Sequence, residues 1–121
     1  MATAVPGEIA GYYVAHQIAG KLSWKELFEP TIALCRNGTQ VSEMLAWGIN
    51  EYEESIRKDP GLSEVLIDSL TNKTLKENDF VRYPKLADTL EKIANGGAKA
   101  FYDGELSKII VEENNLKGIV I

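Results

Sequence analysis

Helix-ending residues recur at short intervals along this chain and limit it to short helices. Such signals stand at Gly20, Asn37-Gly38, Asp59-Pro60-Gly61 and Gly96-Gly97. Glycine favours the position just after a helix, and proline cannot continue one. Between these points, apolar residues recur every three or four positions, which is the period of an amphipathic helix. The sequence therefore predicts a mainly α chain.

The first helix is predicted over residues 7–19, where one apolar stripe carries Ile9, Tyr12, Tyr13 and His16. A capping box follows, in which Ser23 and Glu26 satisfy each other's backbone N–H groups. It opens a second helix over residues 23–36. Pro30 lies inside this stretch and predicts a kink or a break at Glu29.

A third helix is predicted over residues 42–58. Its buried face consists of Leu45, Ile49, Tyr52 and Ile56. The pairs Glu53–Arg57 and Glu54–Lys58 have the favourable order for ion pairs one helical turn apart. The helix should end at Asp59-Pro60-Gly61.

The second half is less regular. A short helical turn is expected at 62–67, and residues 68–82 look irregular or strand-like. Pro84 suits the first turn of a helix over 84–95. Asp103 is the expected N-cap of a last helix over 104–115, with Leu106, Ile109 and Ile110 facing inward.

The composition of the chain argues against nucleic acid and membranes as its main partners. The chain has 121 residues, enough for one small domain, with 45% hydrophobic and 26% charged residues, as in ordinary globular proteins. Its net charge of -5 argues against nucleic acid as the main partner, because phosphate binding requires clustered Lys and Arg. No apolar run approaches the roughly 20 residues that span a bilayer, so we expect no membrane contact from this segment.

Only one cysteine, Cys35, and one histidine, His16, are present. An internal disulfide, a standard zinc site and a Ser-His-Asp triad are therefore not available. We expect His16 to be a core or interface residue with one satisfied ring nitrogen, and Cys35 to be a small buried hydrophobe. Catalysis by a carboxylate, a lysine or an N-terminal threonine stays open.

The clustered acidic residues and the large aromatic residues both have ordinary structural explanations. The acidic residues Glu51, Glu53 and Glu54 are expected on a solvated helix face rather than around a metal ion. The large aromatic residues are expected to be core anchors: Trp24, Phe28, Trp47, Phe101 and Tyr102.

Two tripeptides match the acceptor sequence for N-linked glycosylation, Asn37-Gly38-Thr39 and Asn72-Lys73-Thr74. Each is expected in a surface loop after a helix end. Asn37 and Asn72 are therefore candidate glycosylation sites, with chance occurrence as the alternative.

Two long stretches together resemble the large subunit of the gamma-glutamyltranspeptidases, also called glutathione hydrolases. The first, AVPGEIAGYYVAHQIAGKLSWKELFEPTIALCRNG, covers Ala4 to Gly38 and begins with the family's Val-Pro-Gly turn. The second, YPKLADTLEKIANGGAKAFYDGELSKIIV, covers Tyr83 to Val111 and resembles its Pro-x-Leu-Ala-x-Thr-Leu and Gly-Ala-x-x-Phe-Tyr-x-Gly segments. Residues Leu70 to Arg82 between them are compatible.

The resemblance implies the helical large-subunit portion of an αββα N-terminal-nucleophile hydrolase, incomplete as a fold on its own. Enzymes of this family cleave the gamma-glutamyl bond of glutathione and transfer the glutamyl group to water or amino acids. Their nucleophile is a threonine that becomes N-terminal by self-cleavage, in a Thr-x-His context. They use no metal or organic cofactor.

None of the threonines here is followed two residues later by histidine; they are Thr3, Thr31, Thr39, Thr71, Thr74 and Thr89. The family's substrate-binding arginine and its small-subunit Ser-Ser and Gly-Gly elements also fall outside the resemblance. Gly96-Gly97 lies at a helix end and is not that oxyanion pair. We therefore predict no catalytic residue in this chain, and that the chain alone is inert. The alternative is a non-catalytic helical binding or regulatory module derived from the family.

The expected partners are the rest of the parent's large subunit and its small subunit, with glutathione bound only through the parent. Residues 1–121 are treated as a single segment, with both ends expected to be truncated. The Pro6-Gly7 turn suggests a preceding strand, and Ile119-Val120-Ile121 resembles the start of a buried strand. The chain shows no secretory signal, so its own location stays open, whereas the parent family is extracellular, on the cell surface or periplasmic.

Overall fold

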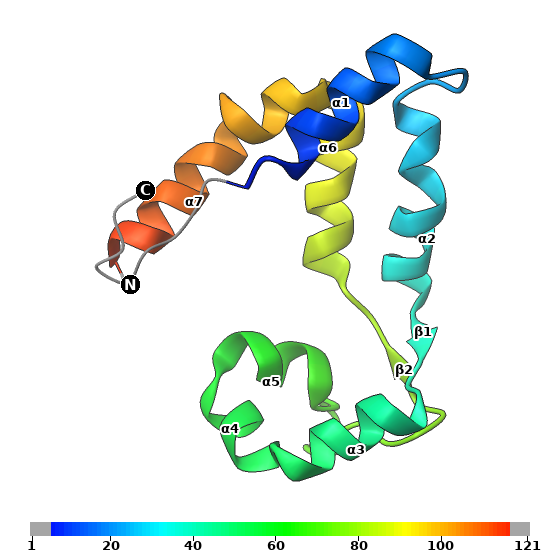
Figure 1. Ribbon diagram of the computed structural model, residues 1–121. Coiled ribbons are helices and arrows are strands. Elements are labelled where there is room, and N and C mark those ends of the chain that lie inside the picture. The colour runs from blue at the N-terminus through cyan, green and yellow to red at the C-terminus, as the bar shows by residue number, and fades with distance from the viewer. Residues whose placement is uncertain (1–5, 117–121) are drawn as a thin grey trace. The chain divides into compact units, whose positions relative to one another are not determined.

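The protein is mainly α-helical (Figure 1). A computed structural model describes residues 6–116. The elements of this part are α1 (Glu8–Ala19), the 3-10 helix η1 (Lys25–Leu27), α2 (Glu29–Asn37), β1 (Thr39–Gln40), α3 (Glu43–Glu51), α4 (Glu53–Lys58), α5 (Pro60–Leu66), β2 (Phe80–Val81), α6 (Pro84–Tyr102) and α7 (Glu105–Leu116).

Two compact units divide the chain. The middle unit is Ala33–Ala87, and the outer unit combines the preceding and following parts of the chain, described over residues 6–32 and 88–116. Each unit is described separately below.

A short antiparallel ladder ties the two ends of the middle unit together. Thr39 of β1 lies opposite Val81 of β2, and Gln40 lies opposite Phe80. The ladder continues for one step, because the Val41 N–H donates to the Asp79 carbonyl at 2.8 Å. It confirms the strand-like part of the expectation for residues 68–82, and the rest of this stretch consists of turns and irregular loop with one isolated bridge between Ile67 and Thr74.

The core of the middle unit forms around this ladder. Val41, Ile49, Ile56 and Val81 are 1–4% exposed and form one cluster. Around it pack Leu45, Ala46, Val65, Leu66, Ile67, Leu75 and Tyr83. The predicted apolar face of residues 42–58 is thus confirmed at Ile49 and Ile56.

The predicted helix 42–58 is two helices, and this is a correction. Tyr52 has φ -107° and ψ 20°, so it ends α3 and also precedes α4. Its N–H donates to the Gly48 carbonyl at 3.0 Å. Tyr52 itself is 60% exposed and does not join the core.

The two ion pairs predicted on this stretch form, and Ser42 adds a cap that the sequence analysis did not predict. The Ser42 hydroxyl caps α3 by accepting from the Leu45 N–H at 3.3 Å. The pairs Glu53–Arg57 and Glu54–Lys58 lie at 2.7 and 2.6 Å. The first pair is partly exposed and the second is largely exposed, so both add little stability.

Asp59 both follows α4 and caps α5. Its carboxylate accepts from the Leu62 N–H at 2.9 Å, and Pro60 occupies the first turn of α5. The predicted end of the third helix and the short helical turn after it are both confirmed.

In the outer unit, α1 ends at Ala19, and Gly20 then takes an extended conformation, as predicted. The capping box is also present: the Glu26 N–H lies 3.3 Å from the Ser23 hydroxyl, and the Ser23 N–H lies 2.8 Å from the Glu26 carboxylate. It opens η1, and α2 starts only at Glu29. The break that Pro30 predicted is confirmed.

Gly97 bends α6. Its φ of 66° and ψ of -165° are non-helical, so the predicted end at residue 95 marks a kink after which the helix continues to Tyr102. A Cβ atom at Gly97 would lie 3.1 Å from the Tyr13 ring. Both the backbone angle and the close ring favour glycine here.

The cap predicted for the last helix is wrong. The Asp103 N–H donates to the Lys99 carbonyl at 3.0 Å and so extends the bonding of α6, while α7 begins at Glu105 after Gly104. Leu106 is buried as expected, but Ile109 is 40% exposed. Lys92 of α6 bonds Glu105 of α7 at 2.7 Å.

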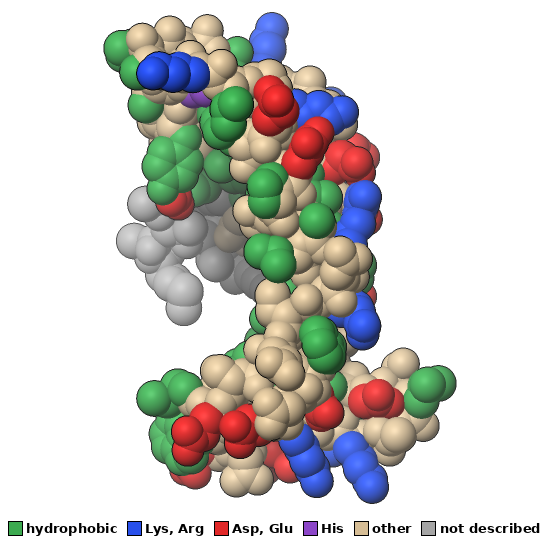
Figure 2. All heavy atoms as spheres, turned by 90° about the vertical axis from the view of Figure 1, so that its right-hand side faces the viewer, with side chains coloured by type: hydrophobic (Ala, Val, Ile, Leu, Met, Phe, Trp, Pro, Cys, Tyr) green, Lys and Arg blue, Asp and Glu red, His purple; other side chains and the backbone are tan. Residues whose placement is uncertain are grey.

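Trp47 was expected in the core and is 58% exposed. It lies two residues before Ile49 on α3, which places it about 200° around the helix from that buried side chain. Figure 2 shows hydrophobic side chains visible among interspersed acidic and basic ones. The predicted truncated start at Thr3 and the predicted apolar end at Ile119-Val120-Ile121 lie outside the described residues.

Replacing Ile49 with alanine should lower the free energy of unfolding of the middle unit by about 3 kcal/mol, because a fully buried methyl-rich side chain leaves a cavity. Urea denaturation followed by circular dichroism measures this. Met44→Ala on the same helix is the control: Met44 is 75% exposed and should change stability by less than about 0.5 kcal/mol. Equal losses in both variants would contradict the assigned core.

Candidate functional site

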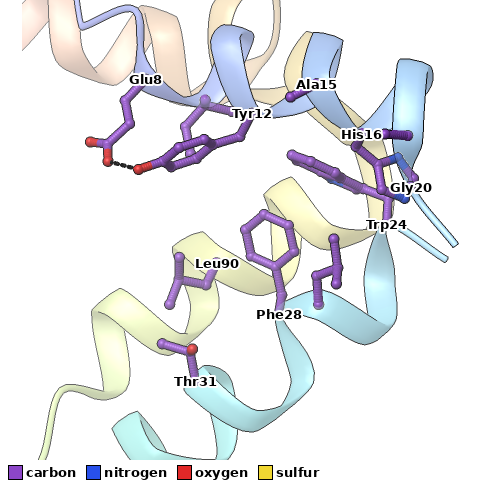
Figure 3. A pocket seen from close by; sticks show the side chains of 12 residues that line it. Glu8, Tyr12, Ala15, His16, Gly20, Trp24, Phe28, Thr31 and Leu90 are labelled. Carbon is purple, nitrogen blue, oxygen red and sulfur yellow. Dashed lines mark hydrogen bonds between the residues drawn. The ribbon is translucent and has the colours of Figure 1, made fainter. Parts of the chain in front are cut away.

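An apolar groove lies within the outer unit. It has a volume of about 650 Å³, within the size range of small-molecule and peptide side-chain sites. Helix α1 forms one wall, and η1, α2 and α6 form the other (Figure 3). Its lining residues are Glu8, Ile9, Tyr12, Ala15, His16, Ala19, Gly20, Trp24, Leu27, Phe28, Thr31 and Leu90.

Trp24 anchors the inner end of the groove. Its indole Nε1 donates to the Ile93 carbonyl of α6 at 3.0 Å. Tyr13 and Phe28 pack against its ring with centroid distances of 5.0 and 4.9 Å. These edge and tilted contacts are favourable aromatic geometries, so the ring is held from several sides. Trp24 and Phe28 are the core anchors that the sequence predicts.

His16 fastens the loop that follows α1. Its Nε2 donates to the Leu22 carbonyl at 2.8 Å, so this nitrogen carries the proton. The Nδ1 atom is buried and has no partner among the described residues. The ring also lies 5.5 Å from that of Trp24. The predicted structural role, with one satisfied nitrogen, is confirmed.

Glu8 and Tyr12 form the polar edge of the groove. The Tyr12 hydroxyl donates to the Glu8 carboxylate, as the dashed line in Figure 3 shows. This hydrogen bond and the negative charge of Glu8 raise the pKa of Tyr12, because both oppose loss of the phenol proton. The phenol is therefore a donor held in place, not an activated nucleophile.

Tyr102 fixes the start of the α1 wall from α6. Its hydroxyl accepts from the Ala10 N–H at 3.1 Å and donates to the Pro6 carbonyl at 2.6 Å. One phenol thus satisfies a free N–H in the first turn of α1, which has no side-chain cap.

The groove suits an apolar group rather than bond breaking. Its titratable groups are the paired Glu8 and Tyr12 and the loop-bonded His16, and no nucleophile is paired with a base in it. Within residues 6–116 there is no group of three or more His, Cys, Asp or Glu arranged to hold a metal ion. Nor does any helix of this part have the length and apolarity to cross a membrane.

The predicted candidate residues lie elsewhere. Asn37 is the last residue of α2, and Asn72 lies in the turn between α5 and β2 with φ 54°; both are exposed. Glu51 is exposed, and Glu53 and Glu54 are ion-paired. Cys35 is 7% exposed, as expected of a buried hydrophobe.

Sequence reasoning did not find the groove, although it named the stripe that forms one wall. The side chains of the stripe have two different environments. Tyr13 and His16 pack against Trp24, whereas Tyr12 lines the groove and is 58% exposed. The sequence signal that could have indicated the groove was the aromatic content of two segments, the α1 stripe and the turn capped by Ser23 and Glu26. The distance between these two segments across the groove depends on α6, which lies far from both of them in the sequence.

The chain was compared with families, sequences and structures of known proteins. A family profile described as Gamma-glutamyltranspeptidase matches residues 1–121. The chain belongs to the gamma-glutamyltranspeptidase family.

Among gamma-glutamyltranspeptidase relatives, glutathione hydrolase 2 of Arabidopsis thaliana is 40% identical over 122 residues, covering 100% of this chain and 21% of the relative. Scoloptoxin SSD14 of Scolopendra dehaani is 40% identical over 121 residues, with the same shares. The crystal structure of Helicobacter pylori gamma-glutamyltranspeptidase superimposes with a TM-score of 0.85 at 28% identity, covering 98% of this chain and 34% of that chain. The chain thus spans about a fifth of the length of these two relatives. The resemblance seen in the sequence is confirmed.

Replacing Leu27 with glutamate should weaken binding of the apolar dye anilinonaphthalene sulfonate about tenfold, or by about 1.4 kcal/mol, because a charge would enter the groove. Fluorescence titration measures this. Leu62→Glu is the matched control: Leu62 is 46% exposed against 47% for Leu27, lies outside the groove and gives the same net charge. Equal weakening by both substitutions would place the dye elsewhere.

The capping box should appear in an acid titration. Hydrogen bonds from the Ser23 side chain and its backbone N–H lower the pKa of Glu26. Glu26 therefore stabilises the fold above its unfolded pKa of about 4.3, and this contribution is lost as pH falls through the lower folded pKa. Carboxyl NMR should show the low midpoint, and Ser23→Ala should move it part of the way back. A midpoint that ignores Ser23→Ala would remove the capping box as its cause.

Proposed function

We propose that this chain is a structural segment of an enzyme that cleaves gamma-glutamyl bonds and transfers the glutamyl group to water or to an amino acid. The carrying observation is that the family profile spans residues 1–121 and the bacterial enzyme superimposes on 98% of the chain. Glutathione is the proposed substrate, because the Arabidopsis relative is named a glutathione hydrolase.

In this proposal the segment supplies support and no bond-breaking group. No threonine in the sequence has histidine two residues later. The described side chains provide caps, an aromatic cluster and a core, all of which position helices. The nucleophile and the groups that stabilise the acyl-transfer transition state come from the rest of the large subunit and from the small subunit.

The apolar groove is the proposed contact with that remainder. A gamma-glutamyltranspeptidase is several times longer than this chain, so most of its packing surface comes from outside residues 1–121. Exposed apolar side chains at the groove rim, such as Tyr12 and Leu27, would gain stability from being covered. We place the assembled enzyme outside the cytoplasm, on the cell surface, extracellular or periplasmic.

A chimaera tests this proposal. Residues 1–121 replace the matching segment of Arabidopsis glutathione hydrolase 2, and release of a chromogenic amine from a gamma-glutamyl anilide is measured. We expect the chimaera to retain activity within about tenfold of the parent, because the transplanted segment carries none of the reacting groups. Ile49→Asp in the chimaera is the control and should abolish folding and activity together. A folded chimaera without activity would contradict a purely structural role.

The purified 121-residue chain should release no amine above background in the same assay. The reason is chemical: acyl transfer requires an activated nucleophile and an oxyanion site. Turnover that survives further purification would overturn this expectation.

A non-catalytic binding or regulatory module is the second candidate. The core of the middle unit favours it, since the buried cluster of Val41, Ile49, Ile56 and Val81 and the side chains packed against it all come from the middle unit. This candidate predicts cooperative thermal unfolding of the isolated chain and little dye binding. The structural-segment proposal predicts broad melting and strong dye binding at the groove.

A further inference from the structure

We propose that Asn72 is an acceptor for N-linked glycan. The Asn72 Nδ2 atom would displace the diphosphate from the anomeric carbon of a lipid-linked oligosaccharide. A C–N bond forms, the C–O bond to the diphosphate breaks, and the amide loses one proton. The modification lies outside the proposed enzymatic function and does not depend on it.

The backbone around Asn72 presents the side chain outward. Asn72 has φ 54°, in the left-handed region that asparagine tolerates better than most residues. Residues 69–73 are all exposed, so the acceptor stands within a continuous solvent-facing run. The turn stays ordered despite this exposure, because the Asn72 N–H donates to the Asp68 carbonyl at 2.8 Å and Arg57 donates to the Asn72 carbonyl at 3.2 Å.

The acceptor groups themselves are not engaged. The Asn72 side-chain amide makes no hydrogen bond to another described residue, and neither does the Thr74 hydroxyl that completes the acceptor tripeptide. Attaching a sugar would therefore break no existing side-chain interaction. The turn's own hydrogen bonds use backbone groups of residues 68–73, the Asp68 carboxylate and the Thr71 hydroxyl, and none of them uses the Asn72 side chain.

A hollow beside the acceptor gives room for the first sugar. It has a volume of about 400 Å³ and is lined by Arg57, Pro60, Ser63, Glu64, Ile67, Asp68, Ser69 and Asn72. An N-acetylhexosamine has one apolar ring face and several hydroxyl groups. Pro60 and Ile67 offer apolar contact, and Ser69 and Arg57 offer polar atoms at the edge.

Asn37 provides a comparison within the same chain. It ends α2, and its carbonyl accepts from Arg82 at 3.2 Å. Gly38 after it has φ 94° and is so closely packed that a Cβ atom would lie 3.1 Å from the Val81 carbonyl. Both threonines are paired through the backbone, Thr39 with Val81 in the β ladder and Thr74 with Ile67 in an isolated antiparallel bridge, so the difference lies at Gly38. The half-buried residue of the Asn37 tripeptide is Gly38 at its centre, whereas in the other tripeptide Asn72 and Lys73 are both exposed and Thr74 is half-buried.

The experiment uses residues 1–121 secreted from a eukaryotic host behind a cleavable leader, since both relatives described above are eukaryotic. Asn37→Asp leaves Asn72 in the only acceptor tripeptide. We expect a mass shift of one glycan, removed by peptide N-glycosidase and assigned to Asn72 by peptide mass spectrometry.

Two further variants control the result. Asn72→Asp keeps a residue that tolerates the left-handed region, and Thr74→Val keeps the shape of the threonine; each should abolish the shift. A co-secreted protein with a known acceptor site reports that the host modifies its cargo. An unmodified Asn72 beside a fully modified reporter would overturn the proposal, as would a shift that survives Thr74→Val.

Discussion

The hydrogen bond from the Trp24 indole to the Ile93 carbonyl is the contact on which the outer unit depends. It joins the turn before η1 to α6, elements separated by 69 residues in the chain. The rings of Tyr13, His16 and Phe28 all pack against the Trp24 ring. This one side chain therefore sets the position of α1 and of the start of α2. Leaving the half-buried indole N–H without its acceptor would lower the free energy of unfolding. Trp24 is therefore the least replaceable residue of the groove.

Local signals predicted the helices well because caps act over only a few residues. Ser23 and Glu26 form the predicted capping box, a helix starts after Ser42, and α4 ends before Asp59 and Pro60, all as expected. The predictions that were wrong concern residues whose state depends on distant partners. Tyr52 interrupts a helix whose apolar period continues through it, and Asp103 stays within α6 bonding rather than capping α7.

The same distinction explains what was predicted of the site. The roles of His16 and Cys35 followed from residue type and spacing, because a lone histidine on an apolar stripe has few chemical options. Trp47 was misplaced because aromatic character says nothing about which side of a helix meets the core. The groove could not be predicted, since its walls come from α1 and α6, whose approach is set by Tyr102 and Trp24.

The conformation of Gly97 has a consequence for anyone who redesigns this segment. Its non-helical backbone angles rotate the second part of α6 relative to the first. Residues before and after Gly97 therefore cannot be placed on one helical wheel. Apolar positions in Pro84–Asn95 and in Ala98–Tyr102 must be assigned to faces separately. A substitution that straightened the helix would rotate Tyr102 away from Pro6 and Ala10, and α1 would lose its tether without any change in α1 itself.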